Sequence, residues 1–391
     1  MKEVTELLRQ KAITNGPEYL VGREKPNNNL VLNKKGEPIR ILMLAAHTCI
    51  RVIKESIALQ RRGYIVDVFA GKLSYGMHNF DRVYMWDSMN LDVGLRQFKG
   101  MLPVIKDIYD IYHYHNEPDF PVALMYHAGV TPIVLDVHDL DSVRQNMLTA
   151  DEYEMFKYAA GTVQVSKPVH DWAIKTHNYR KPSTILYSFC NDELVDYNGD
   201  MDQKRHGIVY EGGANPPSYD AEMGESFRYR SLYPLCKQIV EMGNELHMFI
   251  GNSDAVGPYS DIGAVIYPPT DYEEMMHRLV QFKWGLVAFN NADKTQRQTN
   301  MTLTNKMFEY LAAGMPVIVF GADESARIAT ELGVGICLDK LEDLGSVEEK
   351  FGKVYPQLKA NVDRVRKELL MENNIWHLEN LYREVLSKNV E

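Results

Sequence analysis

A chain of 391 residues exceeds the size of one ordinary hydrophobic core, so we expect two domains. The composition is that of a globular protein, with 45% hydrophobic and 25% charged residues. The net charge of −10 argues against a nucleic-acid-binding protein. No apolar run approaches the ~20 residues of a membrane-spanning helix. The opening residues, MKEVTELLRQK, lack the apolar core of a secretory signal.

The first half of the chain alternates apolar strand patterns with helical patterns. Residues 1–38 form a lead-in that is first amphipathic and then rich in Pro and Asn. Strand–helix–strand order predicts a parallel sheet, so residues 1–190 are expected to form one Rossmann-like domain. Its strands are expected at 39–46, 64–71, 107–115, 131–139, 161–166 and 183–188, with helices at 51–63 and near 119–128.

The same alternation restarts after a polar linker at 191–206. Residues 207–371 are expected to form a second Rossmann-like domain, and 372–391 a final amphipathic helix that docks back on the first domain. The patterns predict strands at 207–213, 246–252, 263–269, 284–290, 317–320 and 334–339, and helices near 229–243, 271–281 and 305–312.

The fold class is therefore α/β, with two doubly wound Rossmann-like domains facing a cleft. Ligands of such sheets bind beyond the carboxyl ends of the strands. The four cysteines, at positions 49, 190, 236 and 337, are widely scattered and favour reduced thiols in a cytoplasmic protein.

The loops after the first strand of each half carry different chemistry. The loop at 46–51 lacks the Gly-x-Gly-x-x-Gly of dinucleotide binding. The second loop begins with Gly212 and Gly213, and Arg228 and Arg230 follow at the start of a helix. Glycines admit a ligand close to the backbone, and arginines at a helix start favour an anion. The alternative is a turn with two solvated arginines.

Three histidines fall near the ends of neighbouring strands. His113 and His115 share one face of a strand, and His138 ends the next strand. They could bind zinc, they could be packed, or they could contact a substrate. Asp139 and Asp141 form a D-x-D pair, which is typical of metal sites in some sugar transferases but also of helix caps. We predict no metal site.

Residues 304–319, TNKMFEYLAAGMPVIV, resemble the N-K-x-x-E-Y-x-A-A-G-x-P-V-I block of GT-B fold glycosyltransferases of the retaining family 4 type. Four other blocks are similar in order and spacing. They are RVIKESIALQRRGYIVDV, DIYDIYHYHNEPD, YRSLYPL and WHLENLYREVL. Together the resemblance spans residues 39–388.

The resemblance implies a nucleotide-sugar donor bound mainly by the second domain. Glu309 would hold the ribose hydroxyls, because a carboxylate accepts from two vicinal hydroxyls. Backbone N–H groups at Leu303, Thr304 and Asn305 would meet the diphosphate. The remaining assignments are Arg230 to the phosphates, His115 to the transferred sugar, His138 to acceptor or sugar, and the segment from Tyr267 to Tyr272 to the base.

The sequence also departs from the family pattern. Met301 stands where many members carry a second Glu, and Gly213 stands where they carry an Arg. Arg228 or Lys306 would then supply the missing charge. The first loop lacks the family's glycine pair, and His47 and Arg51 occupy it, where we expect them to face the acceptor. His115, Arg230 and Lys306 are the predicted catalytic residues.

We expect a glycosyltransferase of the hexosyltransferase type, acting with retention on a UDP- or GDP-type donor and requiring no cofactor. Its acceptor would be a glycan or lipid-linked hydroxyl in surface polysaccharide assembly, with contact at the inner face of the membrane. The alternatives are a nucleotide-sugar epimerase on the same fold, a zinc hydrolase built on His113, His115 and His138, and a binding protein that has lost catalysis.

Overall fold

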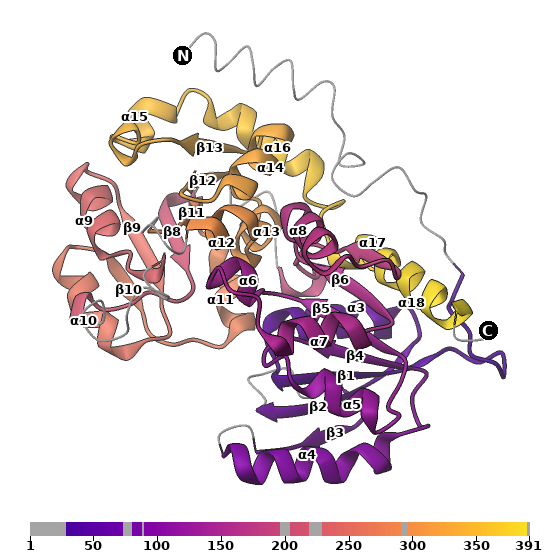
Figure 1. Ribbon diagram of the computed structural model, residues 1–391. Helices are drawn as coiled ribbons and strands as arrows, with labels where there is room; N and C mark the ends of the chain where they lie inside the picture. The colour runs from indigo at the N-terminus through magenta and orange to yellow at the C-terminus, as the bar shows by residue number, and fades with distance from the viewer. Residues whose placement is uncertain are drawn as a thin grey trace. The chain divides into compact units, whose positions relative to one another are not determined.

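The chain folds into two compact α/β units (Figure 1). The computed structural model describes residues 29–72, 80–87, 90–195, 204–218, 229–290 and 296–388. Residues 29–191 and 371–388 belong to one unit, the N-terminal domain, and the described part of 192–370 belongs to the other, the C-terminal domain.

The N-terminal domain is built on a seven-stranded parallel sheet with the order β3-β2-β1-β4-β5-β6-β7. Its strands are β1 (Arg40–His47), β2 (Ile65–Lys72), β3 (Val83–Met85), β4 (Ile111–His115), β5 (Ile133–Val137), β6 (Gly161–Gln164) and β7 (Ser183–Ile185). Its helices are α3 (Ile50–Arg61), α4 (Leu91–Ile105), α5 (Pro121–His127), α6 (Asp141–Arg144), α7 (Ala150–Tyr158) and α8 (Lys167–His177).

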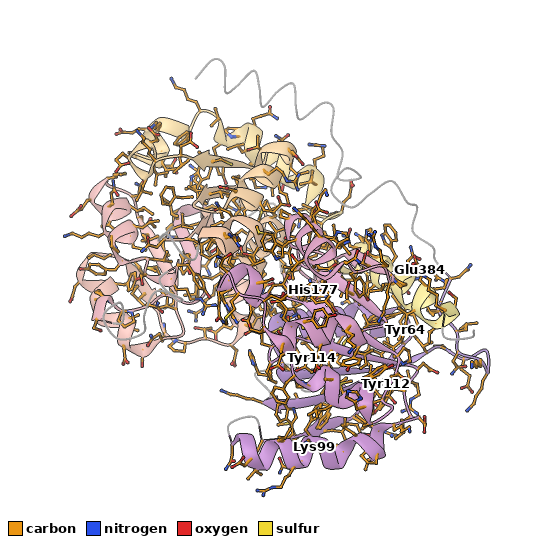
Figure 2. The ribbon with its side chains drawn as sticks, viewed as in Figure 1. Tyr64, Lys99, Tyr112, Tyr114, His177 and Glu384 are labelled. Carbon is orange, nitrogen blue, oxygen red and sulfur yellow. The ribbon has the colours of Figure 1, made fainter. Side chains whose placement is uncertain are left out.

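The central strands are apolar because both of their faces are covered. Every residue of β4 and β5 is buried, as expected for a parallel sheet between helical layers. The large side chains of Tyr112 and Tyr114 lie inside this domain (Figure 2) and are each 1% exposed. Their hydroxyls donate to the carbonyls of Ile105 (2.8 Å) and Pro118 (2.5 Å), so neither buried hydroxyl lacks a partner.

The end of the chain returns to the N-terminal domain. Two helices, α17 (Met371–Asn374) and α18 (Trp376–Lys388), follow the C-terminal domain, and α18 packs against β6 and β7 (Figure 1). The buried carboxylate of Glu379 accepts from Arg62 (3.1 and 3.2 Å) and from the Tyr64 hydroxyl (2.7 Å). These bonds fix α18 on the domain by charge as well as by apolar packing.

The C-terminal domain is built on a six-stranded parallel sheet with the order β10-β9-β8-β11-β12-β13. Its strands are β8 (His206–Glu211), β9 (Leu246–Phe249), β10 (Val265–Tyr267), β11 (Phe282–Ala288), β12 (Val317–Phe320) and β13 (Gly335–Leu338). Its helices are α9 (Tyr233–Glu241), α10 (Ser253–Asp261), α11 (Tyr272–Leu279), α12 (Gln296–Met301), α13 (Asn305–Ala312), α14 (Asp323–Leu332), α15 (Val347–Phe351) and α16 (Tyr355–Val365), with short 3-10 turns at Asp192–Leu194 and Leu341–Asp343.

These two sheets confirm the predicted α/β class with two Rossmann-like domains. The sequence patterns did not predict β3, and they missed the helices α4, α7, α8, α10, α12, α14, α15 and α16. The strand β3 has only three residues and none of them is buried, so it carries no apolar run. Gly94, Gly100 and Pro103 interrupt α4, and Gly257 and Pro258 interrupt α10, which hides the helical pattern in both segments. In the described residues no helix combines the length and apolarity needed to cross a bilayer.

Strand order reverses beside the first strand of each sheet, between β1 and β4 and between β8 and β11. At such a reversal the connections leave in opposite directions, which opens a crevice at the carboxyl ends of the two strands. In the C-terminal domain this crevice is bordered by α13, which Gly285 of β11 allows to approach the sheet. A Cβ on Gly285 would lie 2.3 Å from Cγ of Tyr310, so only glycine fits beneath that ring.

Gly285→Ala should therefore destabilise the protein by about 1–3 kcal/mol, because the added methyl group overlaps a fully buried ring. Gly257→Ala is the matched control, because a Cβ at that helical position meets nothing within 4 Å. We expect the control to keep or raise the free energy of unfolding measured in urea. Equal losses in both variants would contradict this account of α13.

Candidate functional site

Two glycines and two cations meet at the carboxyl end of β8. Gly212 has a φ of +126°, and a Cβ there would lie 3.4 Å from Nζ of Lys306. A Cβ on Gly213 would lie 2.9 Å from Nη1 of Arg230. Each glycine thus leaves room for one cation, and the structure brings Lys306 of α13 and Arg230 to one turn. A turn with two cations is suited to an anionic ligand.

Lys306 lies against aromatic rings rather than in open solvent. Its ammonium is 5.1 Å from the ring centre of Tyr210 and 5.4 Å from that of Phe289, within cation–π range. Burial lowers the pKa of Lys306, and the charge of Arg230 lowers it further, while Glu211 and Glu309 act in the opposite direction. The ammonium is therefore held between a like charge and two carboxylates, poorly hydrated and ready to pair with an anion.

Glu309 occupies the second turn of α13 and is 1% exposed. The hydroxyl of Tyr272, the first residue of α11, donates to its Oε1 at 2.5 Å. The carboxylate therefore already accepts from a hydroxyl, the type of donor that a ribose would present. A ribose at this position would have to share the carboxylate with Tyr272 or displace its hydroxyl.

The first turn of α13 lies beside this carboxylate. Thr304 is the N-cap, but its side chain makes no capping hydrogen bond, and its buried Oγ1 has no partner among the described residues. Leu303 is buried at the entry to the helix, and Asn305 is its first residue. Without a side-chain cap, the first N–H groups of the helix are suited to meet an anion. Met301 ends the preceding helix α12.

Tyr267, assigned to the nucleotide base, points along the sheet toward the start of β9. Its ring stacks on Phe249, with centroids 4.4 Å apart, and its hydroxyl lies 3.1 Å from Nδ1 of His247. The structure therefore does not bring the Tyr267 hydroxyl to Glu309, although Tyr272 does reach it. Arg228, the other arginine of the predicted anion site, lies outside the described residues.

In the N-terminal domain, the charged residues gather around Arg51 at the ends of β1, β4 and β5. Arg51 is 2% exposed, and its Nε donates to both carboxylate oxygens of Asp136 at 3.0 and 2.9 Å. Its Nη2 pairs with Glu55 at 3.0 Å, and its Nη1 donates to the Leu186 carbonyl and Ser188. The guanidinium is thus committed to the interior of the domain. His47, also assigned to the acceptor, is exposed at the end of β1.

The three histidines named from the sequence converge on Asp136. His113 Nε2, His115 Nδ1 and His138 Nε2 lie 3.4–3.6 Å from its oxygens. The other ring nitrogen of His113 meets the Tyr382 hydroxyl of α18 at 2.6 Å. Burial lowers the pKa of His113 and, more strongly, that of His115, so both are neutral at pH 7. The charge of Arg51 holds the pKa of Asp136 well below its usual range, despite burial, which acts to raise it.

The same cluster has the residue types of a zinc site. One possible ligand atom from each of four residues lies within 4.8 Å of the other three, the residues being Glu55, His113, His115 and Asp136. Arg51, however, pairs with both carboxylates, and a metal cation would have to approach that guanidinium. Like-charge repulsion therefore favours an ion-pair network over a metal centre at this position.

Cys49 faces the exposed side of this cluster. It is the N-cap of α3, and its Sγ lies 3.9 Å from Nδ1 of His138. Burial acts to raise the pKa of Cys49, but the charge of His138 and its hydrogen bond lower it below the usual value. Burial acts to lower the pKa of His138, but Cys49 and Asp136 raise it to about 10. Both shifts act in the direction that favours a thiolate–imidazolium pair of these two side chains.

Sequence reasoning missed Glu211, Asp136 and Cys49. Glu211 and Asp136 each stand in or at the end of an apolar strand, GIVYE and IVLDV, and a buried acid in such a run is a usable signal. Cys49 gave no signal, because its neighbour His138 is far away in the sequence.

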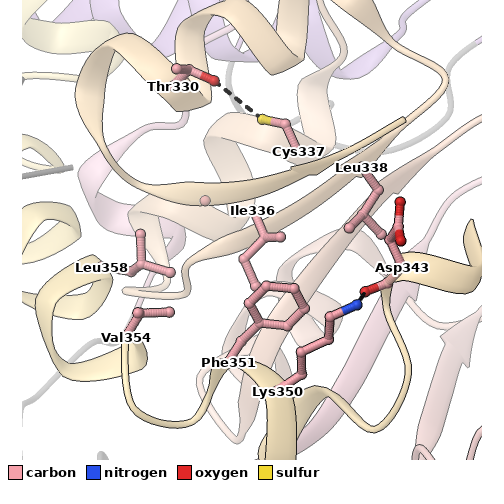
Figure 3. Close-up of a pocket in the computed structure, with 10 residues that line it drawn as sticks. Thr330, Ile336, Cys337, Leu338, Asp343, Lys350, Phe351, Val354 and Leu358 are labelled. Carbon is pink, nitrogen blue, oxygen red and sulfur yellow. Dashed lines mark hydrogen bonds between the residues drawn. The ribbon is translucent and has the colours of Figure 1, made fainter. Parts of the chain in front are cut away.

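A hollow of about 450 Å³ lies against the edge strand of the C-terminal sheet (Figure 3). The turn of Gly212 and Gly213, here called the diglycine turn, follows β8 instead. Ile336 of the edge strand β13, Phe351, Val354 and Leu358 line the hollow, and Thr330 contacts the sulfur of Cys337 at its margin. Its apolar lining offers little to a nucleotide diphosphate.

The thiolate–imidazolium pair predicts selective alkylation. At pH 7, iodoacetamide should modify Cys49 faster than Cys337, which is more exposed but whose pKa burial raises. His138→Gln should slow the reaction at Cys49, because it removes the charge and the hydrogen bond that lower the pKa of this thiol. The wild-type rate should persist as pH falls below the usual thiol pKa of 9.0.

Mass spectrometry of peptides from timed reactions measures both rates. Faster labelling of Cys337, or an unchanged rate at Cys49 in His138→Gln, would count against the pair.

Comparisons with known proteins bear on the fold and on part of the second domain. Residues 260–375 match the family described as glucosyltransferase 3-like, C-terminal domain, which is less than a third of the chain. No curated protein sequence matches significantly. Sucrose-phosphate synthase from Thermosynechococcus elongatus has a similar structure, with a TM-score of 0.67, 13% identity, and coverage of 90% of this chain and all of that chain.

Two further structures share the architecture at lower similarity. HepE of Anabaena, solved with UDP and glucose, has a TM-score of 0.57 and 9% identity over 90% of this chain and 97% of that chain. A candidate UDP-N-acetylglucosamine 2-epimerase from Listeria monocytogenes has a TM-score of 0.54 and 14% identity over 87% of this chain and 94% of that chain. At these identities the likeness concerns the fold, and the fold is that of GT-B glycosyltransferases.

Proposed function

We propose that the protein is a glycosyltransferase of the hexosyltransferase type, which moves a sugar from a UDP- or GDP-type donor to a hydroxyl group with retention. The observation that carries the proposal is the pair of cations, Lys306 and Arg230, on the Gly212–Gly213 turn. Lys306 and the nearby carboxylate of Glu309 lie in the segment that matches the glucosyltransferase 3-like family.

The proposal assigns the donor to the C-terminal domain. The carboxylate of Glu309 would accept from the ribose hydroxyls, and the first turn of α13 would meet the diphosphate. The base would lie along the segment between Tyr267 and Tyr272. Arg228 and Met301 keep no separate role in this assignment.

The chemistry requires positive charge where the sugar–phosphate bond breaks. That bond leaves its electron pair on the diphosphate, and Lys306 and Arg230 would stabilise the charge as it forms. The departing phosphate oxygen would take the acceptor proton as the new glycosidic bond forms on the same face of the sugar. The histidines of the N-terminal domain, His115, His138 and His47, are assigned to sugar and acceptor, while Arg51 would position them through Asp136.

The acceptor and pathway are proposed by analogy. Among fold neighbours, WaaG is described as a glycosyltransferase of lipopolysaccharide biosynthesis. A glycan or lipid-linked acceptor in surface polysaccharide assembly, used by a cytoplasmic enzyme at the inner face of the membrane, fits that analogy. The chemistry proposed here requires no cofactor.

One alternative has a specific observation behind it, namely the shared fold of the candidate epimerase from Listeria monocytogenes. An epimerase would convert the sugar of the donor without an acceptor, whereas a transferase would release nucleotide in step with glycoside formation. A binding protein would bind nucleotide without turnover.

A thermal-shift screen of UDP-, GDP-, ADP- and CMP-sugars is the first experiment, because a ligand that binds only the folded state raises the melting temperature. The donor that gives the largest shift is then used with candidate acceptors. No shift with any nucleotide sugar would contradict the proposal.

Glu309→Ala should weaken nucleotide binding by roughly 10- to 100-fold, because the charged hydrogen bonds to the ribose hydroxyls are lost. Tyr272→Phe keeps the carboxylate and should cost less. Glu274→Ala, on the exposed face of α11, is the control and should bind as the wild type does. Isothermal titration measures all three variants, and unchanged affinity in Glu309→Ala would remove this residue from the site.

Arg230→Ala should lower kcat by about 10²–10³-fold, as loss of one preorganised charge on a transition state does. The exposed Lys237→Ala on α9 is the matched control for net charge. Rates come from nucleotide release with the identified donor and acceptor. If both variants keep the wild-type kcat, Arg230 does not act on the leaving group.

A further inference from the structure

A second cluster of residues that can bind a metal lies at the amino ends of β8 and β9, opposite the diglycine turn. His206 is the first residue of β8, Glu245 precedes β9, and His247 is the second residue of β9. One ligand atom from each falls within a 4.8 Å group. Nε2 of His247 is 3.1 Å, and Nε2 of His206 3.9 Å, from Oε1 of Glu245. Parallel pairing of the strands brings the three together.

The ring of His247 is fixed in place from its other side. The residue is 3% exposed, and Tyr267 lies 3.1 Å from its Nδ1. Its Nε2 is buried and faces Oε1 of Glu245 at 3.1 Å, without the angles of a regular hydrogen bond. A proton on Nδ1, donated to the Tyr267 oxygen, leaves the Nε2 lone pair directed at the cluster, the tautomer that metal-binding histidines use.

The backbone leaves space for this ring. Gly207 has a φ of +60°, and a Cβ there would lie 2.9 Å from Cδ2 and 3.1 Å from Nε2 of His247. A larger residue would push the imidazole away from Glu245. The local sequence, His206 followed by Gly207, therefore supplies a ligand and the room for its partner at once.

We propose that His206, Glu245 and His247 bind a divalent transition-metal ion, zinc by the chemistry of the ligands. Two imidazoles and one carboxylate are ligands that zinc takes, and they leave a further position for water. In contrast to the cluster around Asp136, no Lys or Arg is ion-paired to these three side chains among the described residues. A cation can therefore enter without displacing one of like charge.

The bound ion would join the amino ends of β8 and β9. This edge lies one strand length, about 20 Å, from the diglycine turn that follows β8. The site is therefore independent of the proposed transferase activity, and its expected effect is on the stability of the C-terminal domain.

The test is a zinc titration of the full chain, with any affinity tag removed, against a chromophoric zinc indicator. We expect one zinc ion per chain at this site and a rise in melting temperature. His206→Ala and Glu245→Gln, both at exposed positions, should each weaken binding by more than about tenfold, and Tyr267→Phe by about 10- to 100-fold through the orientation of His247. His127→Ala, an exposed histidine of the other domain, should change nothing.

Melting curves in EDTA establish that the variants are folded, because without metal they should match the wild type. Zinc that binds His206→Ala and Glu245→Gln as tightly as the wild type would overturn the proposal. So would zinc that is lost in His115→Gln but retained in these two variants, because the ion would then belong to the cluster around Asp136. The absence of any stoichiometric zinc would overturn it as well.

Discussion

The ion pair between Arg51 and Asp136 is the interaction on which the charged end of the N-terminal sheet depends. A carboxylate inside a parallel strand loses its hydration, and only a directed cation compensates for that loss. Arg51 supplies it through two short bonds from α3 to β5. Three histidines surround the same carboxylate, but burial lowers the pKa values of His113 and His115, whereas Cys49 and Asp136 together raise that of His138 to about 10.

The C-terminal domain balances charge by another arrangement. Here the cations come from α13 and from the segment before α9, and the carboxylates of Glu211 and Glu309 lie close enough to Lys306 to act on its pKa. Glycines provide the space that this arrangement needs. Gly212 and Gly213 leave room for the two cations, and Gly285 leaves room for the ring of Tyr310, which packs α13 against the sheet. The guanidinium of Arg51 is paired with Asp136 and Glu55 inside the domain, whereas Lys306 and Arg230 lie where a ligand can contact them.

Periodicity in the sequence predicted most of the fold, because parallel strands buried on both faces are continuous apolar runs. It missed β3 and several helices, among them α7, α8, α14 and α16. In α4 and α10 glycine and proline residues hide the helical pattern. Gly212 and Arg230 were predicted from a glycine-containing loop and a helix start, and Lys306 and Glu309 from the resemblance at 304–319. The structure places Gly212, Arg230 and Glu309 near Lys306. Pairings such as Cys49 with His138 depend on strand order, which no local signal encodes.

The difference between the net charge of the whole chain and the charges at the diglycine turn explains how an acidic protein can bind an anion. The formal net charge is −10, so the protein as a whole repels a nucleoside diphosphate. At the diglycine turn two cations lie near two carboxylates, so the local net charge is close to zero. Affinity for a diphosphate must therefore come from the orientation of the cations toward the ligand rather than from net charge. Glu211 and Glu309 oppose the fall in the pKa of Lys306 that burial causes, and a bound diphosphate would act in the same direction. A carboxylate beside the cation weakens the electrostatic attraction for the diphosphate. It also orients the ammonium of Lys306 before the ligand binds, and electrostatic stabilisation acts most strongly when the charges are oriented in advance.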